Sequence, residues 1–146
     1  MSRLVDQVNR LEALVGMTCR QAALAGDEAL MLLFGQTNAA GAKRMLVGQC
    51  WWRLETPDRV IAGSGDLIGD PAHHDQRAGA AHERLERLAG CTLLRYSVDL
   101  PSCMLRAWFS GDLLLWLFPD NTRVYAGEDE RELAWYVAEQ PATGAS

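Results

Sequence analysis

The sequence lacks the features by which nucleic-acid-binding and membrane proteins are usually recognised. Only one of its 14 basic residues is a lysine, Lys43, the formal net charge is −5, and no basic stripe is present. A surface for the phosphate backbone of DNA or RNA usually needs such a stripe, so we expect no nucleic-acid partner. The longest nearly apolar run, residues 113–118, is far shorter than the roughly 20 residues of a membrane-spanning helix, so we expect no membrane span.

The sequence is also poor in cysteine motifs. The four cysteines are widely separated: Cys19, Cys50, Cys91 and Cys103. Without a C-x-x-C motif, the spacing argues against a zinc ribbon or a thioredoxin-like site. The first residues include Asp6 and Glu12 and no apolar stretch of the signal-peptide type. We therefore expect a cytoplasmic protein whose reduced cysteines serve as small buried apolar side chains.

Motifs for nucleophilic and phosphate chemistry are absent as well. There is no G-x-S-x-G elbow, and because the histidines all lie within residues 73–82, no Ser/His/Asp triad can be identified by motif. Residues 63–66 read GSGD, but no Lys or Ser/Thr follows at P-loop spacing. We therefore expect a protein that binds rather than catalyses.

The chain of 146 residues has the length of one domain, and it repeats itself. Residues 10–18 read RLEALVGMT and residues 84–92 read RLERLAGCT, with an offset of 74 residues. A weaker echo relates residues 59–63 to residues 123–127, with an offset of 64. Short matches of Leu, Arg, Gly and Ala also arise by chance in this composition. The conserved order of the echoes favours an internal duplication.

The duplication predicts the organisation of the single domain 1–146. The first copy covers about residues 3–66, and a polar linker follows at about residues 67–80. The second copy covers about residues 81–139, and a C-terminal tail occupies residues 140–146.

A helical pattern opens each copy. In the first copy the apolar stripe has spacings of four, three and four: Leu4, Val8, Leu11 and Val15. In the second copy the stripe consists of Ala81, Leu85, Leu88 and Ala89. Gly16 and Gly90 follow directly, and glycine commonly ends a helix at this position. We expect two short helices, the second beginning near Gly79.

The remaining patterns are those of β-strands. The predicted strands are residues 18–24, 29–34, 45–54, 60–62, 92–98, 103–109, 112–118, 124–126 and 134–138. Gly48, inside the third of these, indicates a bulge or a close backbone approach. Ser110-Gly111 predicts a tight turn and therefore a hairpin. The last strand could equally continue a helix that begins near Glu128.

The strand at residues 112–118 is apolar on both faces. Its alternating side chains are Leu113, Leu115 and Leu117 on one face, and Leu114, Trp116 and Phe118 on the other. Such a strand is either central, with both faces covered, or has one face against a partner subunit. A two-layer arrangement with the helices on one side satisfies the pattern. We predict an α+β fold with mainly antiparallel sheets, built from two pseudo-symmetric copies that are each opened by a short helix.

The segment Trp51-Trp52-Arg53 is the first candidate site. Neighbouring side chains of a strand point to opposite faces, so we expect at least one tryptophan to be exposed or at an interface. Trp and Arg are enriched in binding hot spots, so these three residues are candidates for binding a partner or a ligand. The alternative is structural: one tryptophan in the core and one at an edge, where it covers apolar surface.

The histidine segment is the second candidate site. His73, His74 and His82 lie with Asp75 in one stretch, and imidazole and carboxylate groups suit zinc, manganese or iron. Their spacing is not specific, because adjacent histidines point in different directions, and the stretch falls where a polar linker is expected. The alternative function is a small metal-dependent hydrolase or metal-binding protein that uses a divalent metal at residues 73–83.

Taken together, the motifs resemble a known kind of protein. Each copy contains L-x-x-L-x-G-x-T, a pair of strands ending in Phe, and a strand such as WRLE (52–55) or WYVAE (135–139). This arrangement is similar to that of small bacterial domains of unknown function, some of which are suspected immunity proteins beside polymorphic toxins. The resemblance implies a protein-binding role and assigns no site residues.

We therefore predict a non-enzymatic protein-binding or immunity-like module that needs no cofactor. The negative net charge favours a basic partner, because complementary charge speeds association. An apolar sheet face or the Trp-bearing strand would also suit a homodimer.

Overall fold

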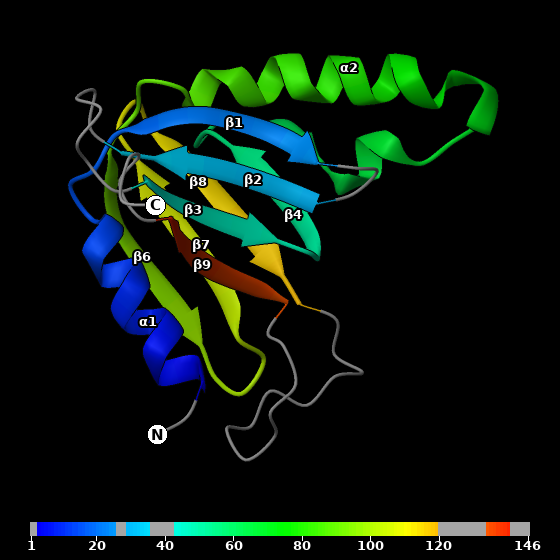
Figure 1. The fold of residues 1–146 in the computed structure, drawn as a ribbon. Coiled ribbons are helices and arrows are strands. Elements are labelled where there is room, and N and C mark those ends of the chain that lie inside the picture. Colours follow the sequence, from blue (N-terminus) through cyan, green and yellow to red (C-terminus); the bar gives the residue numbers. More distant parts are fainter. Residues whose placement is uncertain (1–2, 26–28, 36–42, 120–133, 141–146) are drawn as a thin grey trace.

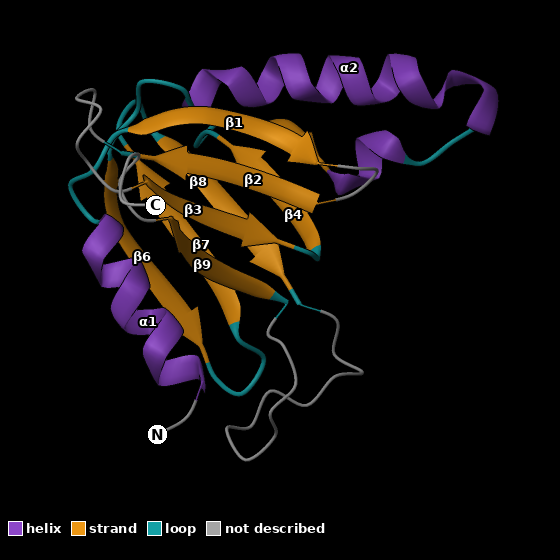
Figure 2. Cartoon of the chain, viewed as in Figure 1, coloured by secondary structure: helices purple, strands orange, loops and turns teal. Residues whose placement is uncertain are grey.

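The computed structural model describes residues 3–25, 29–35, 43–119 and 134–140, which form two antiparallel sheets and two helices (Figures 1 and 2). The helical elements are α1 (Arg3–Leu14), α2 (His74–Leu85) and the 3-10 turns η1 (Ser64–Leu67), η2 (Pro71–His73) and η3 (Glu86–Leu88). The strands are β1 (Cys19–Ala25), β2 (Ala29–Phe34), β3 (Lys43–Gly48), β4 (Trp51–Glu55), β5 (Val60–Gly63), β6 (Leu93–Asp99), β7 (Met104–Phe109), β8 (Leu113–Phe118) and β9 (Trp135–Gln140). The predicted α+β class with mainly antiparallel sheets is confirmed. The predicted strand 124–126, the echo at 123–127 and the helix start at Glu128 lie outside the described residues.

Each half of the chain builds most of one sheet and sends its remaining strands to the other sheet. The four-stranded sheet has the order β1-β2-β3-β9, and the five-stranded sheet has the order β5-β4-β8-β7-β6. The first half therefore supplies the hairpin of β5 and β4, of which β4 pairs with β8, and the second half supplies β9, which pairs with β3. Both sheets are thus completed by the other half of the chain, which contributes one strand to the first sheet and two strands to the second.

The predicted single strand at residues 45–54 is two strands in the structure. β3 ends at Gly48, the chain crosses between the sheets at residues 49–50, and β4 begins at Trp51. An added Cβ at Gly48 would lie 3.1 Å from Leu117 Cδ2 in the facing sheet. The close neighbour of Gly48 is therefore the side chain of Leu117 rather than another backbone, and it accompanies the end of a strand rather than a bulge.

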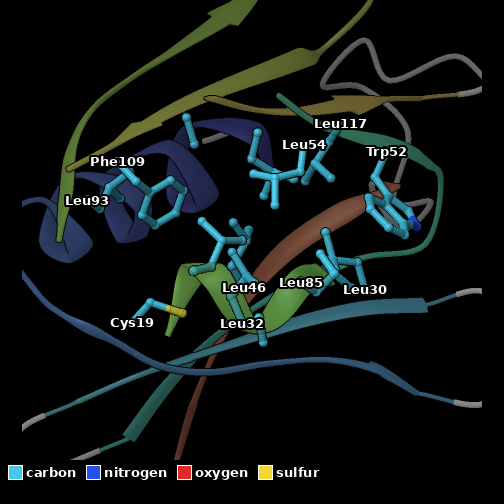
Figure 3. Packing of buried hydrophobic residues seen from close by; sticks show 14 of the residues in the cluster. Cys19, Leu30, Leu32, Leu46, Trp52, Leu54, Leu85, Leu93, Phe109 and Leu117 are labelled. Atoms are coloured by element: carbon cyan, nitrogen blue, oxygen red, sulfur yellow. The ribbon is translucent and has the colours of Figure 1, made fainter. Parts of the chain in front are cut away.

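The core lies between the two sheets (Figure 3). Trp52 and Trp135 are its largest fully buried side chains, with 2% and 0% of their surface exposed. Phe34 and Phe109, from facing sheets, stack with ring centroids 6.2 Å apart. Buried apolar surface contributes about 25 cal/mol per Å², so the inner faces supply most of the force that holds the sheets together.

The helices lie on opposite sides of the sandwich (Figure 1). Helix α1 is joined to β9 because Gln7 Oε1 accepts a hydrogen bond from Val137 N (2.6 Å) and Arg10 donates to Val137 O (2.9 Å). Helix α2 packs against β1 and β5. The expected arrangement with both helices on one side is therefore wrong. Within the described residues, neither helix has the length and apolar character needed to cross a bilayer.

Helix α2 also begins earlier than predicted, at His74 instead of near Gly79. The turn η2 precedes it, and Asp70 Oδ1 caps this turn by accepting a hydrogen bond from Ala72 N (3.0 Å). Pro71 follows at the first helical position, where a missing N–H costs least. Much of the expected polar linker is consequently helical.

The two halves meet symmetrically where β1 and β6 begin. Thr18 and Thr92 form an antiparallel bridge. The flanking hydrogen bonds are reciprocal: Gly16 N to Leu93 O (2.8 Å) and Gly90 N to Cys19 O (2.7 Å). Both glycines have a positive φ, +90° and +89°, which residues with a side chain rarely adopt. An internal duplication would produce such a pair of contacts, and the duplication itself stays a prediction.

Candidate functional site

The structure separates the three predicted binding residues. Along β4, Trp51 is 55% exposed and Arg53 is half-buried on the same outer face. Trp52, between them, is 2% exposed and points into the core (Figure 3). Trp51 and Arg53 therefore remain candidates for binding, whereas Trp52 contributes to packing.

The outer face of the five-stranded sheet collects aromatic and charged side chains from neighbouring strands. Strand pairing places these residues in rows across the sheet, and we call the set the ladder face. The first row is Val60, Glu55, Leu114, Trp108 and Arg95, and the second is Arg53, Trp116, Arg106 and Ser97. The third row joins the pairs Trp51–Phe118 and Met104–Asp99.

Arginine side chains lie over tryptophan rings on the ladder face. The guanidinium carbon of Arg95 is 4.3 Å from the centroid of Trp108. That of Arg106 is 5.5 Å from Trp108 and 5.6 Å from Trp116. Cation–π contacts at these distances contribute about 0.5–1 kcal/mol each at exposed sites. The contacts therefore connect β6, β7 and β8 into one surface.

The same pattern continues to β4. The Arg53 guanidinium lies 5.2 Å from the centroid of Trp116 and 5.3 Å from that of Phe118. The two rings stack with centroids 5.6 Å apart. Glu55 fixes this end of the ladder, because it accepts a hydrogen bond from Trp116 Nε1 and lies 3.4 Å from Arg53 Nε.

At the other end, Arg106 is held in place and Arg95 is not. Arg106 Nη2 lies 3.4 Å from Asp99 Oδ1, and its Nε donates to Ser97 Oγ (3.0 Å). Arg95 is exposed, and apart from its ring contact it makes no ion pair or hydrogen bond with a residue that the structure describes. The ladder face thus has three arginines and two carboxylates, an excess of positive charge in a chain whose net charge is −5.

The ladder face also exposes large apolar groups. Trp51 and Val60 are 55% and 56% exposed. Sequence reasoning found Trp51 and Arg53 on this face. It missed Arg95, Arg106 and Trp108. The alternation within residues 104–109 already puts the last two on one side of a strand, but only the strand order places them on the same face as Trp51 and Arg53, with β8 between β7 and β4.

The residues of the predicted metal site are spread along one helix and the turn before it. His73 and Asp75 are exposed, and His82 Nε2 lies 3.6 Å from Glu86 Oε1. His74 and His82 are eight residues apart in α2, which is about 12 Å along the helix, whereas zinc ligands lie only about 2 Å from the metal. Among the described residues, no three His, Cys, Asp or Glu side chains are grouped to hold a metal ion. The metal alternative stays a prediction without a site in this part of the chain.

Burial makes the thiols of Cys19, Cys50 and Cys103 poor nucleophiles. It raises the pKa of Cys19 and Cys50 to about 12, compared with an ordinary value of 9.0. Burial also raises the pKa of Cys103. These thiols are protonated at neutral pH, and the thiolate is the reactive form. They therefore act as small apolar side chains in the packing of the sandwich.

Comparison with known proteins leaves the site to be interpreted from its geometry alone. The chain matches no family model, and neither a curated protein nor a solved structure shows significant similarity to it. The resemblance to small bacterial immunity-like domains therefore stays a prediction.

Proposed function

We propose that the protein is a non-enzymatic protein-binding module that contacts its partner through the ladder face. The observation that carries this proposal is the continuous array of arginine and tryptophan side chains across four strands. These two residue types are among those enriched at the energetic centres of protein interfaces. The immunity-like role implied by the sequence resemblance is a special case of this proposal.

The requirements of folding do not explain this composition. At the matching outer positions of the four-stranded sheet, the two central strands carry Met31, Leu33, Met45 and Val47. That sheet completes the same sandwich with uncharged side chains at these positions. Arginine and tryptophan on the ladder face therefore need a reason other than sheet formation, and contact with another protein supplies one.

The geometry also favours a protein over a single-stranded nucleic acid. Proteins that bind single strands offer free aromatic faces on which bases stack. Here guanidinium groups lie over Trp108 and Trp116. A base could stack on either ring only by displacing an arginine. A protein side chain can instead pack against the edges of the array without disturbing it.

Site-specific photo-crosslinking in the producing cells tests the proposal. A photoreactive phenylalanine analogue replaces Trp51 or Leu114 on the ladder face. The matched control carries the same group at Glu83, which is exposed on α2. We expect both ladder-face positions to form one covalent adduct of the same mass, with the same protein identified in each, and the Glu83 position to form none.

Two results would contradict the proposal. The first is that no adduct forms at either ladder-face position. The second is that all three positions give similar adducts, which would indicate random collisions. An adduct with a second copy of the chain would identify the partner as the protein itself, in agreement with the homodimer considered from the sequence.

A further inference from the structure

One end of the ladder face has a cation, Arg95, with no counter-charge among the residues that the structure describes, and this indicates the chemistry of the partner. Arg95 and Arg106 both approach Trp108, at 4.3 Å and 5.5 Å from its ring centroid. Arg106 is already bound to Asp99 and Ser97. Arg95 is exposed and has no described carboxylate beside it.

We propose that Arg95, with Trp108 and Arg106 behind it, binds a carboxylate on an acidic segment of the partner protein. This inference rests on the proposed function. A guanidinium that stacks on an indole ring keeps its in-plane N–H groups available, and these groups match the two oxygens of a carboxylate. Trp108 restricts the orientation of Arg95, so less side-chain entropy is lost when the carboxylate binds.

The charge of the site supports this choice over a basic partner. The net charge of −5 predicts attraction to basic proteins for the surface as a whole. On the ladder face, however, three arginines stand against Glu55 and Asp99, and both carboxylates already pair with an arginine. A basic side chain would find no unpaired carboxylate here, whereas an acidic side chain would find Arg95. Local complementarity therefore selects a carboxylate.

The tryptophans provide a site-resolved test with the full-length chain. Each of the five tryptophans contributes one indole N–H resonance to the NMR spectrum of the isotope-labelled protein. The probes are a random copolymer of glutamate and tyrosine, a copolymer of lysine and tyrosine, and oligothymidylate. The buried rings of Trp52 and Trp135 serve as internal controls.

We expect the glutamate copolymer to shift the Trp108 resonance and to leave the Trp52 and Trp135 resonances in place. Arg95→Gln should weaken this binding by about tenfold or more, because a charge-assisted hydrogen bond is lost. The matched control Arg20→Gln removes an exposed arginine from β1, in the other sheet, and should leave the affinity unchanged. Added salt should weaken the binding, since the site is exposed.

The proposal is overturned if the lysine copolymer or oligothymidylate shifts Trp108 and the glutamate copolymer does not. It is also overturned if Arg95→Gln and Arg20→Gln bind the glutamate copolymer equally well. Crosslinking from position 51 in the Arg95→Gln variant distinguishes a failure of this inference from a failure of the proposed function. An adduct as abundant as in the parent chain would leave the ladder face as the binding surface and reject only the carboxylate at Arg95.

Discussion

The two sheets are built alike, yet their outer faces have opposite character. In both sheets two neighbouring interior strands, β2 with β3 and β7 with β8, form an antiparallel pair in matching register. The matching outer pairs are Met31–Val47 with Arg106–Trp116, and Leu33–Met45 with Trp108–Leu114. The strand beside each of these pairs, β9 in the first sheet and β4 in the second, continues the contrast, because Tyr136 and Ala138 occupy the positions that Arg53 and Glu55 hold in the second sheet.

The inner faces do not differ in this way. Trp135 pairs with Gly48 in one sheet, and Trp52 pairs with Leu117 in the other, so each exchanged strand places a tryptophan at the same point of the core. Packing between the sheets constrains the inner residues to be apolar and close-fitting. The outer residues lie outside that layer, and their divergence reports on what each face contacts: Val47 on the first sheet is 6% exposed, whereas Trp51 on the second is 55% exposed.

The largest predicted effect concerns the inner faces, which should respond alike. Replacing either buried tryptophan by alanine, in Trp52→Ala or Trp135→Ala, removes a large core side chain and should lower the free energy of unfolding by about 3–5 kcal/mol. Urea unfolding followed by circular dichroism measures both. If one variant lost less than about 1 kcal/mol, the two tryptophans would not be equivalent in the core.

Phenylalanine variants refine this comparison where alanine prevents folding. Trp135 Nε1 donates to Cys103 O (2.7 Å), whereas the buried Trp52 Nε1 has no hydrogen-bond partner among the described residues. Trp135→Phe should therefore cost about 1 kcal/mol more than Trp52→Phe, because it leaves a buried carbonyl without its donor. Equal costs would show that this hydrogen bond adds little to the position.

The elements themselves could largely be predicted from the sequence, because periodicity reports directly on local structure. Residues 29–34 were predicted as a strand with the observed bounds, and the hairpin at Ser110-Gly111 is present between β7 and β8. Which sheet each strand joins could not be predicted, since periodicity distinguishes the faces of a strand and not its neighbours. The exchange of β4 and β9 depends on pairings between distant parts of the chain.

The candidate site shows the same limit. Trp51 and Arg53 were found because three conspicuous residues are consecutive in the sequence. Trp108 and Arg95 lie on different strands and meet only through the pairing of β6 with β7. A surface built across strands has no sequence motif. Its residues can be recognised once the strand order is known, and not before.

The stability of the fold at alkaline pH should depend on the buried thiol of Cys19, which occupies the position that Leu93 holds in the other sheet. Cys19 pairs with Phe34, as Leu93 pairs with Phe109. The folded-state pKa of Cys19, about 12, is above the ordinary 9.0, so the neutral thiol stabilises the fold below pH 9.0 and this contribution is lost as the pH rises toward 12. The loss should be on the order of 1 kcal/mol at about pH 10.

Thermal unfolding between neutral pH and about pH 10 measures this loss. The melting temperature of the parent chain should fall over this interval, and that of Cys19→Ala should fall less, because the variant has one buried thiol fewer. Identical pH profiles of the two chains would mean that Cys19 does not titrate as a buried thiol.

The smallest expected change in stability is the most informative about function. The double variant Arg106→Met with Trp108→Leu gives β7 the outer residues of β2. It removes cation–π contacts and a half-exposed ion pair, each worth no more than about 1 kcal/mol, and it adds apolar side chains that suit a sheet. We expect the free energy of unfolding to fall by about 1 kcal/mol or less, while crosslinking from Trp51 is lost.

A fall of about 3 kcal/mol or more would show that the ladder face is needed to hold the sheet together, and the contrast between the outer faces would then reflect folding. If the variant is stable and no longer forms the adduct, the outer residues of β7 serve binding. The outer residues of β2 then show what folding alone requires.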